Sequence, residues 1–122
     1  MNKHELEERL ISFAVLIIEI AETIPDSKAA SYLASQLLRS GTSLALNYGG
    51  VQSGESRKDF IHKIKIVLKE LRETQICKKI MHRSKLFTNE GKVVSAIKES
   101  DELISIFVKS AETAQKNATK PY

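Results

Sequence analysis

The chain has 122 residues, of which 42% are hydrophobic, with a formal net charge of +4 and a single cysteine. This length allows one compact core and is too short for two typical domains. One cysteine excludes an internal disulfide and a cysteine-based zinc cage, and no secretory leader pattern is present, which favours a cytoplasmic protein. The most apolar run, Phe13 to Ile18, is far shorter than the roughly 20 residues that cross a bilayer, so we expect no membrane span.

Apolar residues recur every three or four positions in the first half of the chain, which is the period of an amphipathic helix. A first helix over about 3–24 carries its stripe at Leu6, Leu10, Phe13, Ile17, Ile20 and Ile24 and ends before Pro25. A second helix over about 27–49 ends at Gly49-Gly50 and carries Gly41 on its inner stripe. Glycine costs about 1 kcal/mol there relative to alanine but lets a neighbour approach closely, so Gly41 predicts a packing contact.

The second half repeats the pattern twice. A third helix over about 55–86, capped by Ser53 or Ser56, carries Phe60, Ile64, Val67 and Leu71, and a fourth covers about 89–117. Four such patterns joined by short polar links bury their stripes most simply as an antiparallel up-down four-helix bundle. We therefore predict a single all-α domain over 1–122.

The stretch from Gly49 to Ser56 has the glycine spacing of a phosphate-binding loop. That loop requires a preceding strand and a lysine that reaches the phosphates, whereas here a helix precedes and Glu55 takes the place of the lysine. The segment is therefore interpreted as a turn between two helices.

Positive charge is concentrated in the third helix. Residues 1–24 contain two Lys/Arg and five Asp/Glu, a charge of −3, whereas residues 57–85 contain ten Lys/Arg and three Asp/Glu, a charge of +7. At about 100° per residue, one arc of the third helix collects His62 and six cations. These six are the predicted nucleic-acid contacts: Lys58, Lys65, Lys69, Arg72, Lys79 and Arg83.

The inner stripe of the third helix loses its phase after Thr74, where Lys78 takes a position that an apolar residue should hold. Either the helix bends, or an apolar patch faces something outside the bundle. An exposed patch would favour a homo-oligomer. The predicted interface residues are Ile76, Ile80 and Met81.

Signatures of catalysis and of metal binding are weak. The three histidines are scattered, and Asp59 with His62 imitates only one of the two carboxylate-x-x-His pairs by which four-helix bundles hold two metal ions. We expect no catalytic residues, no metal site and no cofactor.

Leu38 to Glu73 carry a family resemblance. The typical core of one family is matched in two parts. The first part consists of Arg39-Ser40, Ser43-Leu44 and Asn47, and the second of Ser56-Arg57, Asp59-Phe60-Ile61, Lys69-Glu70 and Glu73. The chain resembles the small four-helix-bundle proteins encoded in intervening sequences of bacterial large-subunit ribosomal RNA genes. It differs at Gly50-Val51, where relatives carry an acidic residue and alanine, and at Gln75-Ile76, where they carry an aromatic pair.

The resemblance implies a ring-like homo-oligomer, a pentamer in relatives, with a poorly defined function. A related bundle is the accessory protein of diversity-generating retroelements, whose basic surface engages nucleic acid and a reverse transcriptase. Our leading hypothesis is a non-enzymatic oligomer that binds RNA or DNA backbones through the third helix without reading sequence. The alternative is a protein-interaction module that does not bind nucleic acid itself.

Overall fold

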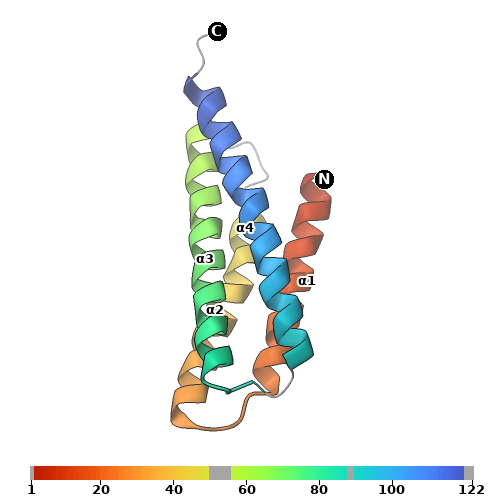
Figure 1. Cartoon of the computed structure of the whole chain (residues 1–122). Coiled ribbons are helices and arrows are strands. Elements are labelled where there is room, and N and C mark those ends of the chain that lie inside the picture. The colour runs from red at the N-terminus through yellow and green to blue at the C-terminus, as the bar shows by residue number, and fades with distance from the viewer. Residues whose placement is uncertain (1, 50–55, 88–89, 120–122) are drawn as a thin grey trace.

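The computed structural model describes residues 2–49, 56–87 and 90–119, and these form a bundle of four α-helices (Figure 1). The helices are α1 (Lys3–Glu22), α2 (Lys28–Gly49), α3 (Arg57–Arg83) and α4 (Glu90–Thr119). Each helix runs antiparallel to the one before it. The helix α1 packs against α2 and α4, and α3 also packs against α2 and α4, so α1 and α3 occupy diagonal corners. The predicted all-α four-helix bundle is confirmed, and the described residues contain no strand.

Side-chain caps and one backbone turn define the helix ends. The Asn2 side chain accepts a hydrogen bond of 2.8 Å from the backbone N–H of Glu5, and the Glu5 carboxylate accepts from the backbone of Asn2 in return. Ser56, one of the two predicted caps of α3, is confirmed, because its Oγ accepts a hydrogen bond from the Asp59 N–H at 3.2 Å; the other, Ser53, lies outside the described residues. Because α2 is a helix, no strand leads into the glycine-rich segment; residues 50–55 themselves lie outside the described residues.

The third helix ends at Arg83, earlier than the sequence pattern predicts, in a turn without glycine. Lys85 has φ 58°, the left-handed conformation that usually favours glycine. The backbone N–H groups of Lys85 and Leu86 donate to the carbonyls of His82 and Met81 at 3.1 and 3.0 Å. This pattern is a Schellman motif, and it satisfies carbonyls that the end of a helix leaves without partners.

The core confirms the packing role predicted for Gly41. A Cβ atom at this position would lie 2.8 Å from Cγ2 of Ile17, which is fully buried on α1. The close approach of α1 to α2 therefore depends on Gly41, a residue without a side chain. Farther along α2, the ring of Tyr48 meets that of Phe107 on α4 edge to face, with centroids 5.6 Å apart.

The phase loss in α3 has a simpler explanation than a bend. Thr74 and Lys78 continue the inner stripe and are fully buried, so polar residues hold core positions within one continuous helix. Ile76 and Ile80 face outward, with exposed fractions of 55% and 46%. Met81 is fully buried in the core, so the structure corrects its assignment to an oligomer interface.

Candidate functional site

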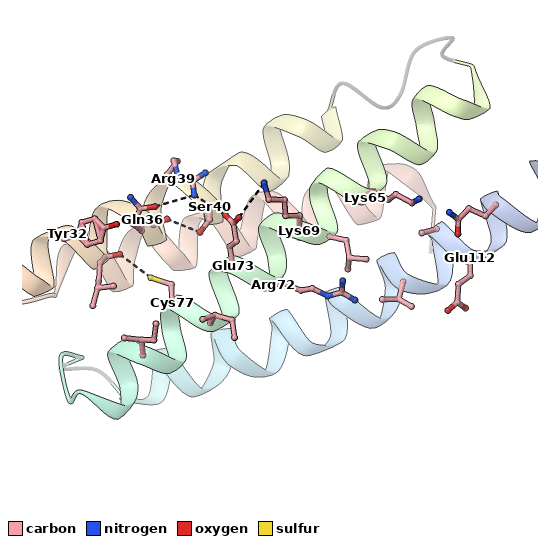
Figure 2. Close-up of a pocket in the computed structure, with 17 residues that line it drawn as sticks. Tyr32, Gln36, Arg39, Ser40, Lys65, Lys69, Arg72, Glu73, Cys77 and Glu112 are labelled. Carbon is pink, nitrogen blue, oxygen red and sulfur yellow. Dashed lines mark hydrogen bonds and ion pairs between the residues drawn. The ribbon is translucent and has the colours of Figure 1, made fainter.

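An open groove of about 1020 Å³ extends over the outer face of α3, between α2 and α4 (Figure 2). Its apolar lining includes Leu33, Leu68, Ile76, Cys77 and Ile80. Its cationic lining consists of Arg39 from α2 with Lys65, Lys69 and Arg72 from α3. Two carboxylates, of Glu73 and Glu112, also line it, so the groove combines an apolar surface with more cations than carboxylates.

The six predicted contact residues are all exposed on α3, but only half of them line the groove. Lys65, Lys69 and Arg72 do so, while Lys58, Lys79 and Arg83 lie on the same helix outside the groove lining. At 1.5 Å per residue, the distance along the helix from Lys58 to Arg83 is about 37 Å. The structure therefore divides the predicted set into a central part and two ends.

Ion pairs reduce the positive charge on the α2 side of the groove. Arg39 donates to the Glu73 carboxylate at 3.1 Å and to that of Glu70 at 3.5 Å, and these contacts raise the pKa of the guanidinium. Nζ of Lys69 lies 3.9 Å from the Glu73 carboxylate. Within the described part of the chain, no carboxylate is within ion-pair distance of Lys65 or Arg72.

Beneath the groove, Lys78 points away from solvent into the core. Its Nζ donates to the Ala96 carbonyl at 2.8 Å and to Ser100 Oγ at 3.1 Å, and it lies 4.8 Å from the centroid of the Phe13 ring. Burial lowers the pKa of this ammonium to about 7, an effect that the nearby Asp101 carboxylate partly opposes. Lys78 is thus part of the core and not of the basic outer face.

The family model for the 23S rRNA-intervening sequence protein matches residues 2–109, nearly the whole chain. The chain belongs to this family. The structure is also similar to a member of the S23 ribosomal protein family from Bacteroides thetaiotaomicron VPI-5482, which is described as a protein with unknown function. The TM-score is 0.81 at 28% sequence identity, over 92% of this chain and 99% of that one. No curated protein matches.

Four residues of the family's core pattern, Arg39, Ser40, Glu70 and Glu73, lie where α2 meets α3. Besides the Arg39 ion pairs, the Thr74 hydroxyl donates to Ser40 Oγ at 2.8 Å, and the Ser40 hydroxyl donates to the Gln36 carbonyl at 3.0 Å. Both hydroxyls are buried. In this family member the motif therefore joins two helices, and three of its charged residues, Arg39, Lys69 and Glu73, also line the groove. The complementary charges of Arg39, Glu70 and Glu73 were a signal for this pairing that sequence reasoning missed.

The remaining candidates do not come together as a reactive site. His4, His62 and His82 are exposed on α1 and at well-separated positions of α3. Residues 2–49, 56–87 and 90–119 hold no group of three or more His, Cys, Asp or Glu side chains placed to bind a metal ion. Burial raises the pKa of the Cys77 thiol, which disfavours the reactive thiolate. In the same ranges, no helix has the length and apolar character needed to cross a bilayer.

Proposed function

We propose that this family member is a non-enzymatic, self-associating protein of the cytoplasm that binds RNA or DNA through phosphate contacts on the outer face of α3. The observation that carries the proposal is the exposure of the six cations along one face of a single helix: Lys58, Lys65, Lys69, Arg72, Lys79 and Arg83. A row of exposed cations suits a phosphate backbone, which presents negative charge at regular intervals.

The chemistry of this face favours backbone contacts over the reading of bases. Lysine and arginine neutralise phosphates without regard to sequence, whereas sequence is read by contacts to base edges or by stacking on aromatic rings. The groove offers one aromatic side chain, Tyr32, at the α2 side of its lining. Six phosphate contacts predict a slope of about −5 in log K against log salt for duplex DNA.

The test measures the affinity for RNA and DNA oligonucleotides as a function of salt. Charge reversal at Lys58, Lys79 and Arg83 leaves the groove lining unchanged, and we expect it to weaken binding at least tenfold. The loss of three contacts should also reduce the salt slope by about three. A matched control reverses Lys3, Lys28 and Lys98, which lie outside α3, for the same change in net charge. Equal affinity of the two variants, or binding by the parent that does not depend on salt, would contradict the proposal.

The apolar lining of the groove favours a second candidate, a protein-interaction module. Phosphate contacts do not require exposed isoleucines, whereas a helix laid into a groove does require apolar anchoring positions. The accessory role expected from the family resemblance, for example beside a reverse transcriptase, belongs to this candidate. A complete lack of nucleic-acid binding at low salt would favour it. Light scattering tests the ring-like pentamer that the resemblance implies.

A further inference from the structure

The groove over α3 has two ends of different chemistry. At the end between α2 and α3, the side chains of Tyr32, Ile76 and Ile80 are 62%, 55% and 46% exposed. Leu33 and Cys77 complete this apolar end, where the Cys77 thiol donates to the Leu33 carbonyl at 3.4 Å across the two helices. Large apolar side chains that gather in the open at one end of a groove are typical of a surface that another molecule covers.

The charged end lies on the α4 side of α3 (Figure 2). Its cations are Lys65 and Arg72, which have no carboxylate at ion-pair distance in the described part of the chain. The buried side chains of Leu68 and Ala111 line the groove between them and α4. Glu112 is the carboxylate in this part of the described lining, so two cations stand against one anion.

The middle of the groove carries little free charge. Arg39 and Lys69 lie 3.1 and 3.9 Å from the Glu73 carboxylate, so their positive charge is largely compensated within the protein. The surplus of positive charge is therefore found at one end and the exposed apolar surface at the other. An occupant that matches both is acidic at one end and apolar at the other.

The groove has the length of a short helix. From Lys65 to Ile80 the distance along α3 is about 22 Å, which corresponds to about 15 residues of an α-helix. The midpoint of Lys65 and Arg72 lies about 14 Å along α3 from the midpoint of Ile76 and Ile80, or about nine to ten helical residues. A helix with apolar anchors at i and i+4 and carboxylates about ten residues away would therefore meet both ends at once.

We propose that the groove binds an amphipathic helix of a partner protein, with its apolar anchors on Ile76 and Ile80 and its carboxylates on Lys65 and Arg72. An amphipathic helix laid into an open apolar groove is a common mode of protein recognition. Apolar burial supplies most of the affinity, and the charges at one end determine which way the helix runs. The proposal gives the protein-interaction candidate a site and a partner chemistry, and it does not depend on nucleic-acid binding by the same protein.

A designed peptide of about 15 residues serves as the probe, with leucines on one face at one end and glutamates at the other. A second peptide carries lysines in place of the glutamates. By fluorescence anisotropy, we expect the parent protein to bind the acidic peptide about tenfold or more tightly than the basic one. Lys65→Glu with Arg72→Glu should reverse this order. The matched control, Lys79→Glu with Arg83→Glu, makes the same change in net charge outside the groove lining and should keep the order of the parent.

Two further changes test the apolar end and the charge balance. Ile76→Asp with Ile80→Asp should weaken binding of the acidic peptide about tenfold or more, whereas Leu46→Asp with Val94→Asp should bind as the parent does. The control side chains are 78% and 57% exposed outside the groove lining. Glu112→Gln should strengthen binding about twofold, because it removes a carboxylate that repels the glutamates. Weaker binding by this variant, or a charge-reversed control that behaves like the groove variant, would overturn the proposal.

Light scattering and an oligonucleotide titration distinguish the other occupants. We expect Ile76→Asp with Ile80→Asp to keep the mass of the parent; a lower mass would show that a second copy fills the groove and would overturn the proposal. A parent that binds the acidic peptide but no RNA or DNA supports this proposal and refutes nucleic-acid binding. A parent that binds RNA with a steep salt dependence but neither peptide refutes the groove proposal and leaves nucleic-acid binding standing.

Discussion

Two helix contacts fill their inner positions in opposite ways: the α1–α2 contact uses a residue without a side chain, and the α3–α4 contact uses a long charged one. Where α1 crosses α2, Gly41 removes a side chain so that buried Ile17 can pack against the backbone. Where α3 meets α4, Lys78 inserts a long side chain whose ammonium is bonded to Ala96 and Ser100. Both positions belong to regular inner stripes.

The difference shows that helical period determines which positions are buried but not what chemistry they hold. A lysine is tolerated in this core because its methylene chain is apolar and its nitrogen has hydrogen-bond acceptors on α4. The ammonium must still lose its hydration, and burial accordingly lowers its pKa to about 7. The α1–α2 contact involves no such charge and should be insensitive to pH in this range.

The largest expected effect concerns Lys78. The unfolded chain holds the Lys78 proton up to about pH 10.4, whereas the folded protein releases it near 7. Between these values the unfolded state binds more protons, so the free energy of unfolding should rise with pH by up to about 1.4 kcal/mol per pH unit. This contribution is full above the unfolded pKa and is lost as the pH falls through the folded pKa. Urea denaturation between pH 6.5 and 9.5 would measure it.

Lys78→Met tests whether Lys78 causes this pH dependence, because methionine keeps an unbranched side chain and removes the charge. We expect it to stabilise the protein by about 1–4 kcal/mol at pH 7 and to flatten the pH profile. Ser100 retains a partner after the change, since its hydroxyl donates to the Ile97 carbonyl at 2.8 Å. A variant with the same pH slope as the parent would show that another group titrates.

Gly41→Ala tests the contact between α1 and α2. The added methyl group would meet Ile17 at 2.8 Å, and overpacking of this kind costs about 1–3 kcal/mol. Alanine has a better helix propensity than glycine by about 1 kcal/mol, so we expect a net loss of stability of about 0–2 kcal/mol. Ile17→Ala in the same chain should turn the effect of Gly41→Ala favourable, which a double-mutant cycle by thermal melting can measure. Additive effects would argue against contact between these two positions.

The hydrogen bond between the hydroxyl groups of Thr74 on α3 and Ser40 on α2 should contribute less to stability than either of these contacts. Thr74→Val keeps the shape of the side chain and removes the donor to Ser40, while Ser40 still donates to the Gln36 carbonyl. We expect a loss of about 1 kcal/mol in the free energy of unfolding, the usual net value of one hydrogen bond. Thr113→Val, at an exposed position of α4, is the control and should change stability little.

The smallest effect belongs to the link between α1 and α4. Arg9 donates hydrogen bonds of 2.7 Å to the carboxylates of Glu99 and Glu102. The bond to Glu99 lowers the pKa of the Glu99 carboxyl. We expect Arg9→Ala to lower the free energy of unfolding by about 0.5–1 kcal/mol at neutral pH. That difference should be present above the unfolded pKa of Glu99 and disappear as the pH falls through its folded pKa. A difference that stays constant as the pH falls below the folded pKa of Glu99 would assign the effect to lost packing.

Much of the architecture follows from the sequence because it rests on local periodicity. The regular apolar stripes identify the helices, and Pro25, Gly49 and Ser56 mark helix boundaries. The end of α3 was predicted too late, because Lys85 adopts a left-handed conformation that glycine usually takes and its sequence gives no such signal.

The candidate site was harder to predict because it depends on which helices are neighbours. The cations of α3 could be listed from their period, but the division between groove and ends appears only when α2 and α4 flank the helix. The interface prediction is wrong for Met81 because a lysine is not expected in a core, so the burial of Lys78 appears in the sequence as a loss of helical phase.

The order of the helices around the bundle also bears on folding kinetics. Three of the four helix pairs join neighbours in the chain, and such local contacts are typical of bundles that fold in microseconds to milliseconds. The pair α1–α4 joins the two ends, and in Figure 1 these helices diverge toward the N-terminus of α1. Because closing the longest loop costs the most chain entropy, we expect the α1–α4 contact and its Arg9 ion pairs to form after the transition state. Their removal should therefore accelerate unfolding and leave the refolding rate nearly unchanged.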